Sequence, residues 1–330
     1  MKGFLSILFI CFSFNQFGQT SITKDSICMG VSFSITAIHN SSLLASNSVD
    51  KAYQEINRIE ELISSWKETS QTSEINRQAG ISSVKVDLEL YNLIARSKKI
   101  SELTNGYFDI SFASVDKIWN FSDRKLTKLP SKEAIESSVK RIDFRNIILN
   151  ESDTSVFLKE KGMKIGLGAI GKGYAANQAK LIMKGLGVEN GVVNASGDLA
   201  SWGHKIDGSE WTIGIKDPKS KAEVMGWLNI TNTSVVTSGN YEKFIELEGK
   251  RYCHIINPKT GFPVTGITSV TIICNDTEIA DALATAVFIL GKEDGMKLIN
   301  HLKGVEGLII DDEFKLHSSQ NLNKNFYLSN

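Results

Sequence analysis

The sequence has no excess charge of either sign, which argues against the function classes that depend on one. Lysine and arginine together number 37 and are matched by 37 acidic residues. Nucleic-acid-binding proteins usually carry a basic patch, and solvating segments are strongly acidic. The even balance, with 42% hydrophobic and 22% charged residues, predicts a folded soluble protein that binds no nucleic acid.

Cysteine is scarce, and the few cysteines are scattered. The chain contains 4, of which Cys11 lies in an N-terminal apolar run and Cys28, Cys253 and Cys274 lie beyond it. No two of them have C-x-x-C spacing. This pattern argues against a disulfide framework and against a zinc site. The cysteines beyond the N-terminal run are therefore expected to be free, buried thiols.

The N-terminal apolar run, residues 4–14 behind Lys2, is too short to cross a bilayer. Such a run followed by polar residues is typical of a secretory signal, so we expect residues 1–19 to be removed and residues 20–330 to form the mature domain. Bulky residues precede Cys11 where a lipid-attachment box has small ones. We expect export to the periplasm or cell envelope without a lipid anchor, with a buried N-terminal strand as the alternative.

No internal repeat, low-complexity segment or interdomain linker divides the rest of the chain. Helical and alternating apolar patterns predict interspersed helices and strands, hence a single α+β unit. The main predicted helices are residues 48–64, 87–103, 131–141, 174–186, 276–291 and 293–302, and the main predicted strands are residues 27–38, 163–165, 192–194, 211–215, 225–230, 251–256 and 267–274.

The stretch at residues 165–176, IGLGAIGKGYAA, breaks into closely spaced glycines before a predicted helix. Backbone N–H groups in such a loop favour an anion, so a phosphate or diphosphate site is the first hypothesis. Gly166 and Gly171 bound a G-x-G-x-x-G pattern, but the acidic residue that would bind a ribose is missing. Gly166 to Lys172 also resembles a P-loop, except that Gly173 replaces the hydroxyl residue that holds Mg²⁺. A tight structural turn is the alternative.

Asp281 and Thr285 form a second constellation, because residues four apart share one face of a helix. A carboxylate and a hydroxyl supply the hard oxygens that Mg²⁺ prefers. An aspartate among small apolar residues also needs a partner, since an unpaired buried charge is costly. The alternative is a capping aspartate with a threonine bonded back to its own helix.

Several aromatic residues and a histidine are further candidates. Tyr107 and Phe108, just before Asp109, either pack and cap or form a stacking platform for a planar ring. Trp66 follows a predicted helix and is expected at the edge of the core, with ligand contact as the alternative. His254 is a candidate base because an unperturbed histidine titrates near pH 6.5, whereas a core histidine is the alternative.

The chain resembles the ApbE family, the FAD:protein FMN transferases, over about residues 28–302. The resemblance rests on motifs in family order: MG at 29–30, TNGYFD at 104–109, AIGKGYA at 169–175, SGD at 196–198, TSGxYE at 237–242, HIxxPxTG at 254–261 and DALATA at 281–286. Each motif alone is weak, but their order is hard to obtain by chance. The resemblance implies an ApbE-like fold with mixed or antiparallel sheets and flanking helices.

The resemblance further implies that FAD binds with its diphosphate on Mg²⁺. The metal would be held by Asp281, Thr285 and the carbonyl of Ala169, with the carbonyl of Ala284 as a further ligand. The hydroxyl of Thr285 would replace the one missing at Gly173. The residues that would contact FAD are Met29, Trp66, Tyr107, Phe108, Asp109, Gly166, Lys172, Ser238 and Ile255.

The implied activity is transfer of FMN from FAD to a threonine or serine hydroxyl of a partner protein, such as a membrane redox subunit, with release of AMP. Mg²⁺ and Lys172 would offset the diphosphate charge, Asp281 would make turnover metal-dependent, and His254 would act as the base. An FAD pyrophosphatase, in which water replaces the hydroxyl, is one alternative. A non-catalytic periplasmic FAD-binding protein is another, because Gly166 stands where many family members carry aspartate. A Rossmann oxidoreductase is disfavoured by the missing ribose-binding acid.

Overall fold

The computed structural model describes residues 18–115, 118–119, 121, 129–220, 223–247, 250–322 and 326–328. The expected signal peptide, residues 1–19, lies outside these ranges except for its last two residues. Within the described ranges, no helix is both long and apolar enough to cross a membrane.

An eight-stranded sheet forms the centre of the fold, with the strand order β1-β2-β6-β7-β10-β13-β14-β15. Every neighbouring pair in it is antiparallel. These strands are β1 (Thr20–Cys28), β2 (Val31–His39), β6 (Asn190–Ala195), β7 (Asp198–Trp202), β10 (Ser234–Gly239), β13 (Ile267–Cys274), β14 (Glu306–Asp311) and β15 (Leu316–Ser318).

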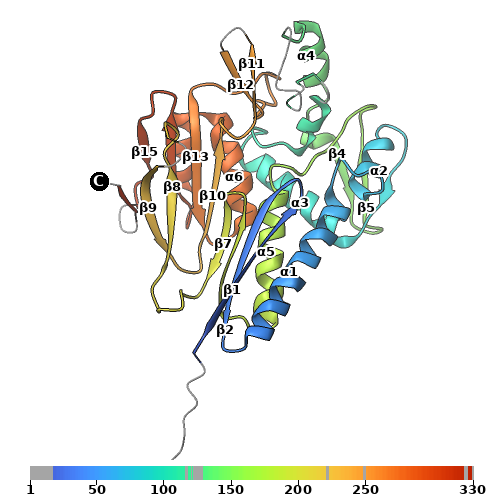
Figure 1. Cartoon of the computed structure of the whole chain (residues 1–330). Helices are drawn as coiled ribbons and strands as arrows, with labels where there is room; N and C mark the ends of the chain where they lie inside the picture. Colours follow the sequence, from blue (N-terminus) through green and yellow to red (C-terminus); the bar gives the residue numbers. More distant parts are fainter. Residues whose placement is uncertain are drawn as a thin grey trace, which may run out of the picture.

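Three smaller antiparallel sheets surround the central one (Figure 1). Their strands are β8 (Trp211–Lys216), β9 (Val224–Ile230) and β16 (Phe326–Leu328); β3 (Val84–Lys85), β4 (Ile147–Asn150) and β5 (Ser155–Leu158); and β11 (Phe244–Leu247) and β12 (Lys250–Cys253). The β11–β12 hairpin projects from one end of the molecule beside α4 (Lys132–Val139).

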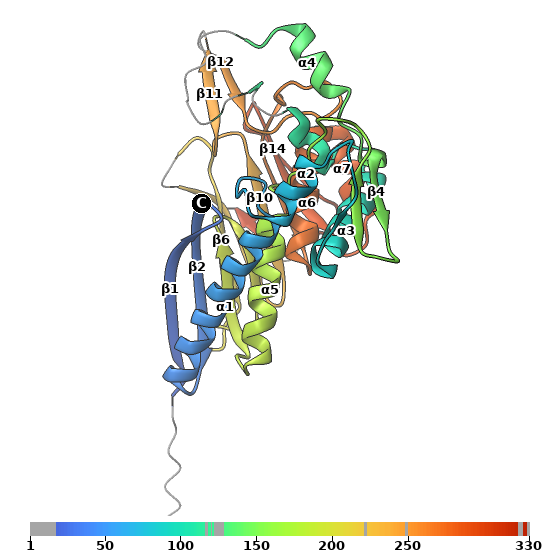
Figure 2. The same ribbon diagram turned by 90° about the vertical axis from the view of Figure 1, so that its right-hand side faces the viewer.

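The helices pack mainly on one face of the central sheet, where α1 and α5 run side by side (Figure 2). The remaining helices are α1 (Ser42–Ile63), α2 (Gln71–Arg77), α3 (Leu88–Leu103), α5 (Gly171–Gly185), α6 (Thr277–Leu290) and α7 (Lys292–His301), with 3₁₀ turns η1 (Ile110–Val115) and η2 (Phe144–Asn146). The combination of helices with antiparallel sheets confirms the expected α+β class.

The core is divided by the central sheet. On the helical face, α1 and α5 pack against β2 and β6, and α6 and α7 pack against β13 and β14. On the other face, Ile215 and Leu228 of the β8–β9 sheet pack against Val235 and Leu308. The central strand β13 is therefore covered on both sides, which explains its nearly continuous run of buried β-branched residues.

The predicted strand at residues 27–38 is wrong near its start. Met29 and Gly30 have φ values of 52° and 74°, so the chain reverses there and forms the β1–β2 hairpin. The predicted strand at 163–165 is also absent. The backbone N–H and carbonyl of Ile165 are bonded instead by the side chain of Asn76, at 2.7 and 2.9 Å. This bonding leaves residues 163–170 as a loop that leads into α5.

Other boundaries differ by smaller amounts. The α5 helix begins at Gly171 rather than Tyr174, and the first residues of the TSGxYE motif, 237–239, end β10. The strand predicted at 251–256 ends at Cys253. The predicted free thiols are confirmed, because Cys28, Cys253 and Cys274 are all buried and unpaired in the described structure.

Candidate functional site

The crossing of α5 and α6 requires a glycine at its closest point. A Cβ at Gly173 would lie 2.2 Å from the carbonyl oxygen of Thr277 and 2.8 Å from the Cβ of Asp281. No side chain fits into that space without separating the helices. The hydroxyl residue expected from the P-loop pattern is thus excluded at position 173 for a packing reason.

Close approach of the helices lets a carboxylate of α6 cap the start of α5. The N–H of Gly173 donates to Asp281 Oδ2 at 3.0 Å, which satisfies one of the free amides in the first turn of α5. Asp281 is only 2% exposed. In the described part of the chain, no N–H donates to the carbonyl of Ala169, the residue four positions before Gly173. That carbonyl therefore remains available to a ligand at the start of the helix.

Lys172 lies between two buried carboxylates. Its Nζ donates to Asp198 Oδ2 at 2.6 Å and lies 3.4 Å from Asp281 Oδ1. Loss of hydration lowers the pKa of Lys172, but the charges of Asp198 and Asp281 outweigh this effect and leave the pKa above its ordinary value. Burial and then the charge of Asp281 raise the pKa of Asp198, against the opposing charge of Lys172. The cluster therefore keeps a protonated lysine bonded to Asp198, whose own affinity for a proton is raised.

The hydroxyl of Thr285 lies one helical turn beyond Asp281 on α6. Thr285 is half-buried, and its hydroxyl has no hydrogen-bond partner among the described residues. With Asp281 and the carbonyl of Ala169, it offers three different hard oxygens, which is the donor set that suits Mg²⁺. Ala284 is buried inside α6, where the helix itself uses its carbonyl. No group of three or more His, Cys, Asp or Glu side chains with metal-site geometry occurs among the described residues, so a metal here would rely on mixed ligands.

Two of the predicted flavin contacts border the glycine loop. Met29 lies in the β1–β2 turn, and its Cε would be 3.5 Å from a Cβ at Gly171. Trp66 follows Ser65, whose Oγ would be 3.7 Å from a Cβ at Gly166. The indole of Trp66 is 87% exposed, so its expected place at the core edge is wrong. An exposed aromatic side chain beside this glycine loop is free to stack on a ring.

The neighbouring residues of the TNGYFD motif have different environments. Tyr107 is half-buried and packs against the apolar cluster that includes Ile255 and Ala284, with the Lys259 ammonium 4.1 Å from its ring centroid. Phe108 is 1% exposed, so its ring fills the core rather than forming a stacking platform.

The carboxylate of Asp109 is satisfied within the protein. It accepts hydrogen bonds from the N–H and hydroxyl of Ser111, at 2.8 and 2.6 Å, and from the N–H of Phe144, at 2.9 Å. Burial raises its pKa, and these bonds oppose the rise. Asp109 therefore ties η1 to η2 behind Tyr107.

Gly166 is held close to η1. Its N–H donates to the carbonyl of Ile110 at 2.8 Å, and a Cβ would lie 3.1 Å from that of Ala113. An aspartate here would press on Ala113, so the missing carboxylate matches the local packing. Ser238 lies near the end of β10, opposite Val270 of β13, and is half-buried.

His254 lies just after the end of β12, outside the strand, and its side chain is half-buried. Its Nδ1 lies 3.1 Å from the carbonyl oxygen of Lys243, and its ring meets that of Phe121 edge-on with centroids 6.5 Å apart. Burial lowers the pKa of His254 to about 4, and the charges of Lys243 and Lys172 act in the same direction. The imidazole is therefore neutral at pH 7 and electrostatically linked to the Lys172 cluster.

Two acidic residues of the site lie within the sequence motifs but were not predicted as site residues. Asp198 ends the SGD motif and bonds Lys172 directly. Glu242 ends the TSGxYE motif, and its charge acts on the pKa of both Lys172 and Asp198. The signal available for both was a carboxylate that ends a motif, at the start of β7 for Asp198 and in the turn between β10 and β11 for Glu242.

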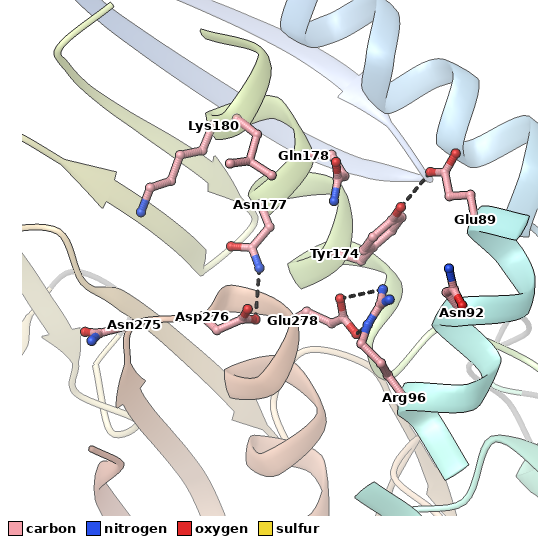
Figure 3. Close-up of a pocket in the computed structure, with 11 residues that line it drawn as sticks. Glu89, Asn92, Arg96, Tyr174, Asn177, Gln178, Lys180, Asn275, Asp276 and Glu278 are labelled. Carbon is pink, nitrogen blue, oxygen red and sulfur yellow. Dashed lines mark hydrogen bonds and ion pairs between the residues drawn. The ribbon is translucent and has the colours of Figure 1, made fainter. Parts of the chain in front are cut away.

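A separate cavity of about 500 Å³ lies between α3, α5 and α6 (Figure 3). Its charged and aromatic residues are already paired: Arg96 with Glu278 at 2.7 and 3.0 Å, and Tyr174 with Glu89 at 2.6 Å. These bonds fasten the helices to each other. The bonds around the cavity therefore hold α3 against α5 and α6 on the side of the crossing that carries Glu278.

Comparisons with known proteins match nearly the whole chain. The family model described as "ApbE family" matches residues 29–309. The FAD:protein FMN transferase of Treponema pallidum is 32% identical over 287 residues, covering 82% of this chain and 79% of that protein. One from Klebsiella pneumoniae is 32% identical over 262 residues, covering 79% and 81%.

A solved structure agrees with these relatives. The crystal structure of the ApbE protein from Thermotoga maritima has a TM-score of 0.84 and 31% identity, and the alignment covers 91% of this chain and 97% of that one. The motifs, the fold and the α5–α6 site thus lie within one continuous match, and the chain belongs to the ApbE family.

Proposed function

We propose that this chain is an FAD:protein FMN transferase, which moves FMN from FAD to a threonine or serine hydroxyl of a partner protein and releases AMP. The observation that carries the proposal is the α5–α6 crossing, where Asp281 accepts the N–H of Gly173 and faces the ammonium of Lys172. Thr285 lies one helical turn beyond Asp281 on α6, and Ala169 lies just before the start of α5. Two relatives that are 32% identical bear this activity as their name, which supports the same reading.

The donors at the crossing fit a divalent cation. Asp281, Thr285 and the Ala169 carbonyl would hold Mg²⁺, since the hydroxyl and the carbonyl have no partner in the described structure. The ion would neutralise the diphosphate of FAD and stabilise the AMP that leaves.

The chain's own residues divide the remaining work. Lys172 stays protonated, because its pKa is raised, and places a fixed positive charge beside Asp198 and Asp281. His254 is neutral and able to take the proton of the attacking hydroxyl. As that oxygen bonds to the phosphorus on the FMN side, the bond from this phosphorus to the oxygen of AMP breaks. The exposed Trp66 and the half-buried Tyr107 would orient the ring systems of FAD.

A pyrophosphatase would use the same groups with water as the nucleophile, and a binding protein would stop after FAD binds. One incubation of the protein with FAD, Mg²⁺ and a threonine-bearing acceptor domain separates the three. Equal amounts of FMN-modified acceptor, detected by mass spectrometry, and released AMP are expected for the transferase. AMP with free FMN and unmodified acceptors would indicate the pyrophosphatase, and intact FAD would indicate a binding protein.

We further propose that the protein is exported, acts free in the periplasm or cell envelope, and modifies a subunit of a membrane redox complex. The signal-like residues 1–19 motivate the export, and the absence of small residues before Cys11 motivates the free form. Fractionation of cells that express the full chain tests both statements. We expect the same soluble envelope fraction for the natural chain and for Cys11→Ser, and a loss of membrane association in Cys11→Ser would show a lipid anchor.

A further inference from the structure

Lys172 is shared unequally by two carboxylates. Its ammonium is 2.6 Å from Asp198 Oδ2 but 3.4 Å from Asp281 Oδ1. The shorter contact is with the residue that has no place among the metal ligands proposed above. Both carboxylates are buried, so solvent screens neither interaction well.

Asp198 is held by the backbone on both sides. It is the first residue of β7 and pairs with Ala195 of β6 and Val236 of β10. The turn before it contains Ser196 and Gly197, with φ values of 55° and 106°. Because two neighbouring strands hold its backbone, its carboxylate is a rigid anchor rather than part of a mobile loop.

One oxygen of Asp281 is already engaged at the start of α5. Its Oδ2 accepts the N–H of Gly173 at 3.0 Å, which leaves Oδ1 facing the ammonium of Lys172. A lysine that moved fully onto Oδ1 would occupy the oxygen that a divalent cation needs. The two positive charges would also repel each other at such short range.

We propose that Asp198 is a positioning residue that holds the ammonium of Lys172 away from Asp281 and so leaves Asp281 Oδ1 open to the metal. Asp198 acts through Lys172 and binds neither metal nor flavin itself. Without its charge, the ammonium has Asp281 as its nearest carboxylate and moves onto Oδ1. The inference rests on the metal site of the proposed function and adds a residue that keeps this site available.

The test measures binding of Mn²⁺ to the flavin-free protein by electron paramagnetic resonance, with Mg²⁺ as the competitor. We expect Asp198→Asn to raise the Mn²⁺ dissociation constant at least tenfold. Adding Lys172→Met to Asp198→Asn removes the competing ammonium, so the double variant is expected to bind within threefold of the natural protein. A merely structural role of Asp198 would not be rescued by a second substitution.

Two results would overturn the proposal: unchanged metal binding in Asp198→Asn, or a folded double variant that binds as weakly as Asp198→Asn. Circular dichroism and thermal melting establish that each variant is folded. If Asp198→Asn alone does not fold, Lys172→Met and the double variant decide the question. The proposal then requires that the Mn²⁺ dissociation constant of each is at most three times that of the natural protein.

Failure of the metal site itself can be distinguished from failure of the proposed role of Asp198. Asp281→Asn is expected to abolish Mn²⁺ binding in the same assay, and binding of natural strength in that variant would overturn the site and this inference together. Loss of binding in Asp281→Asn with unchanged binding in Asp198→Asn would overturn the inference alone.

Discussion

Replacing Gly173 by alanine tests how tightly the site depends on the α5–α6 crossing. The added Cβ would lie 2.2 Å from the carbonyl oxygen of Thr277, about 1 Å short of ordinary contact, and the obstacle is backbone rather than a flexible side chain. Overpacking of this kind costs about 1–3 kcal/mol, whereas alanine in place of glycine within a helix stabilises by about 1 kcal/mol. We expect a net loss near the upper end, about 2 kcal/mol, which lowers the melting temperature of a chain of this length by roughly 3 °C.

Gly185→Ala is the matched control, because Gly185 lies in the same helix and no atom would lie within 4 Å of its Cβ. This control is expected to gain up to about 1 kcal/mol from helix propensity. Thermal melting by circular dichroism measures both variants, and FAD binding is expected to fall only in Gly173→Ala. A Gly173→Ala protein that melts at or above the temperature of Gly185→Ala would refute the packing argument.

Three further predictions concern the chemistry. Asp281→Asn is expected to slow metal-dependent AMP release at least about 100-fold in a coupled AMP assay, whereas Asp276→Asn, at the cap of the same helix, is expected to keep the natural rate. Equal rates in the two variants would exclude Asp281 from metal-dependent catalysis. His254→Ala should bind FAD normally but transfer FMN about 10²–10⁴-fold more slowly. Because the pKa of His254 is lowered to about 4, protonation removes the base only below that pH; a loss of rate near pH 6.5, read from the pH–rate profile, would contradict this assignment. Trp66→Ala is expected to weaken FAD binding about 2–10-fold in a fluorescence titration, and unchanged affinity would exclude ring stacking on Trp66.

The elements that the sequence predicted well are those whose burial pattern is uniform. The strand at residues 267–274 agrees with β13, because a strand covered on both faces requires a nearly continuous apolar run. The helix at 276–291 was equally clear, since Asp276 caps it and Gly291 ends it. Long segments with one environment and clear terminators leave few alternatives.

The turn at Met29 was missed because the apolar pattern continues on both sides of it. Only the positive φ of two adjacent residues reverses the chain there, and Met29 is not a residue that usually adopts this conformation. The loop at 163–170 was mistaken for a strand because Asn76, distant in sequence, satisfies its backbone.

The site was predictable in type but not in its pairings. The carboxylate of Asp281 needed a partner by elementary electrostatics, and the sequence offered no way to choose among distant ones. Tertiary packing supplies the partners: the N–H of Gly173 and the ammonium of Lys172, which Asp198 in turn holds. The exposure of Trp66 likewise depends on where the chain runs after α1.

The most direct test of the central claim is the anomalous diffraction signal of Mn²⁺ in crystals grown with Mn²⁺ and FAD. The account predicts a peak at the α5–α6 crossing, in contact with Asp281, Thr285 and the carbonyl of Ala169, with the diphosphate beside it. A well-occupied peak elsewhere, with the flavin diphosphate bound away from α5, would contradict the account.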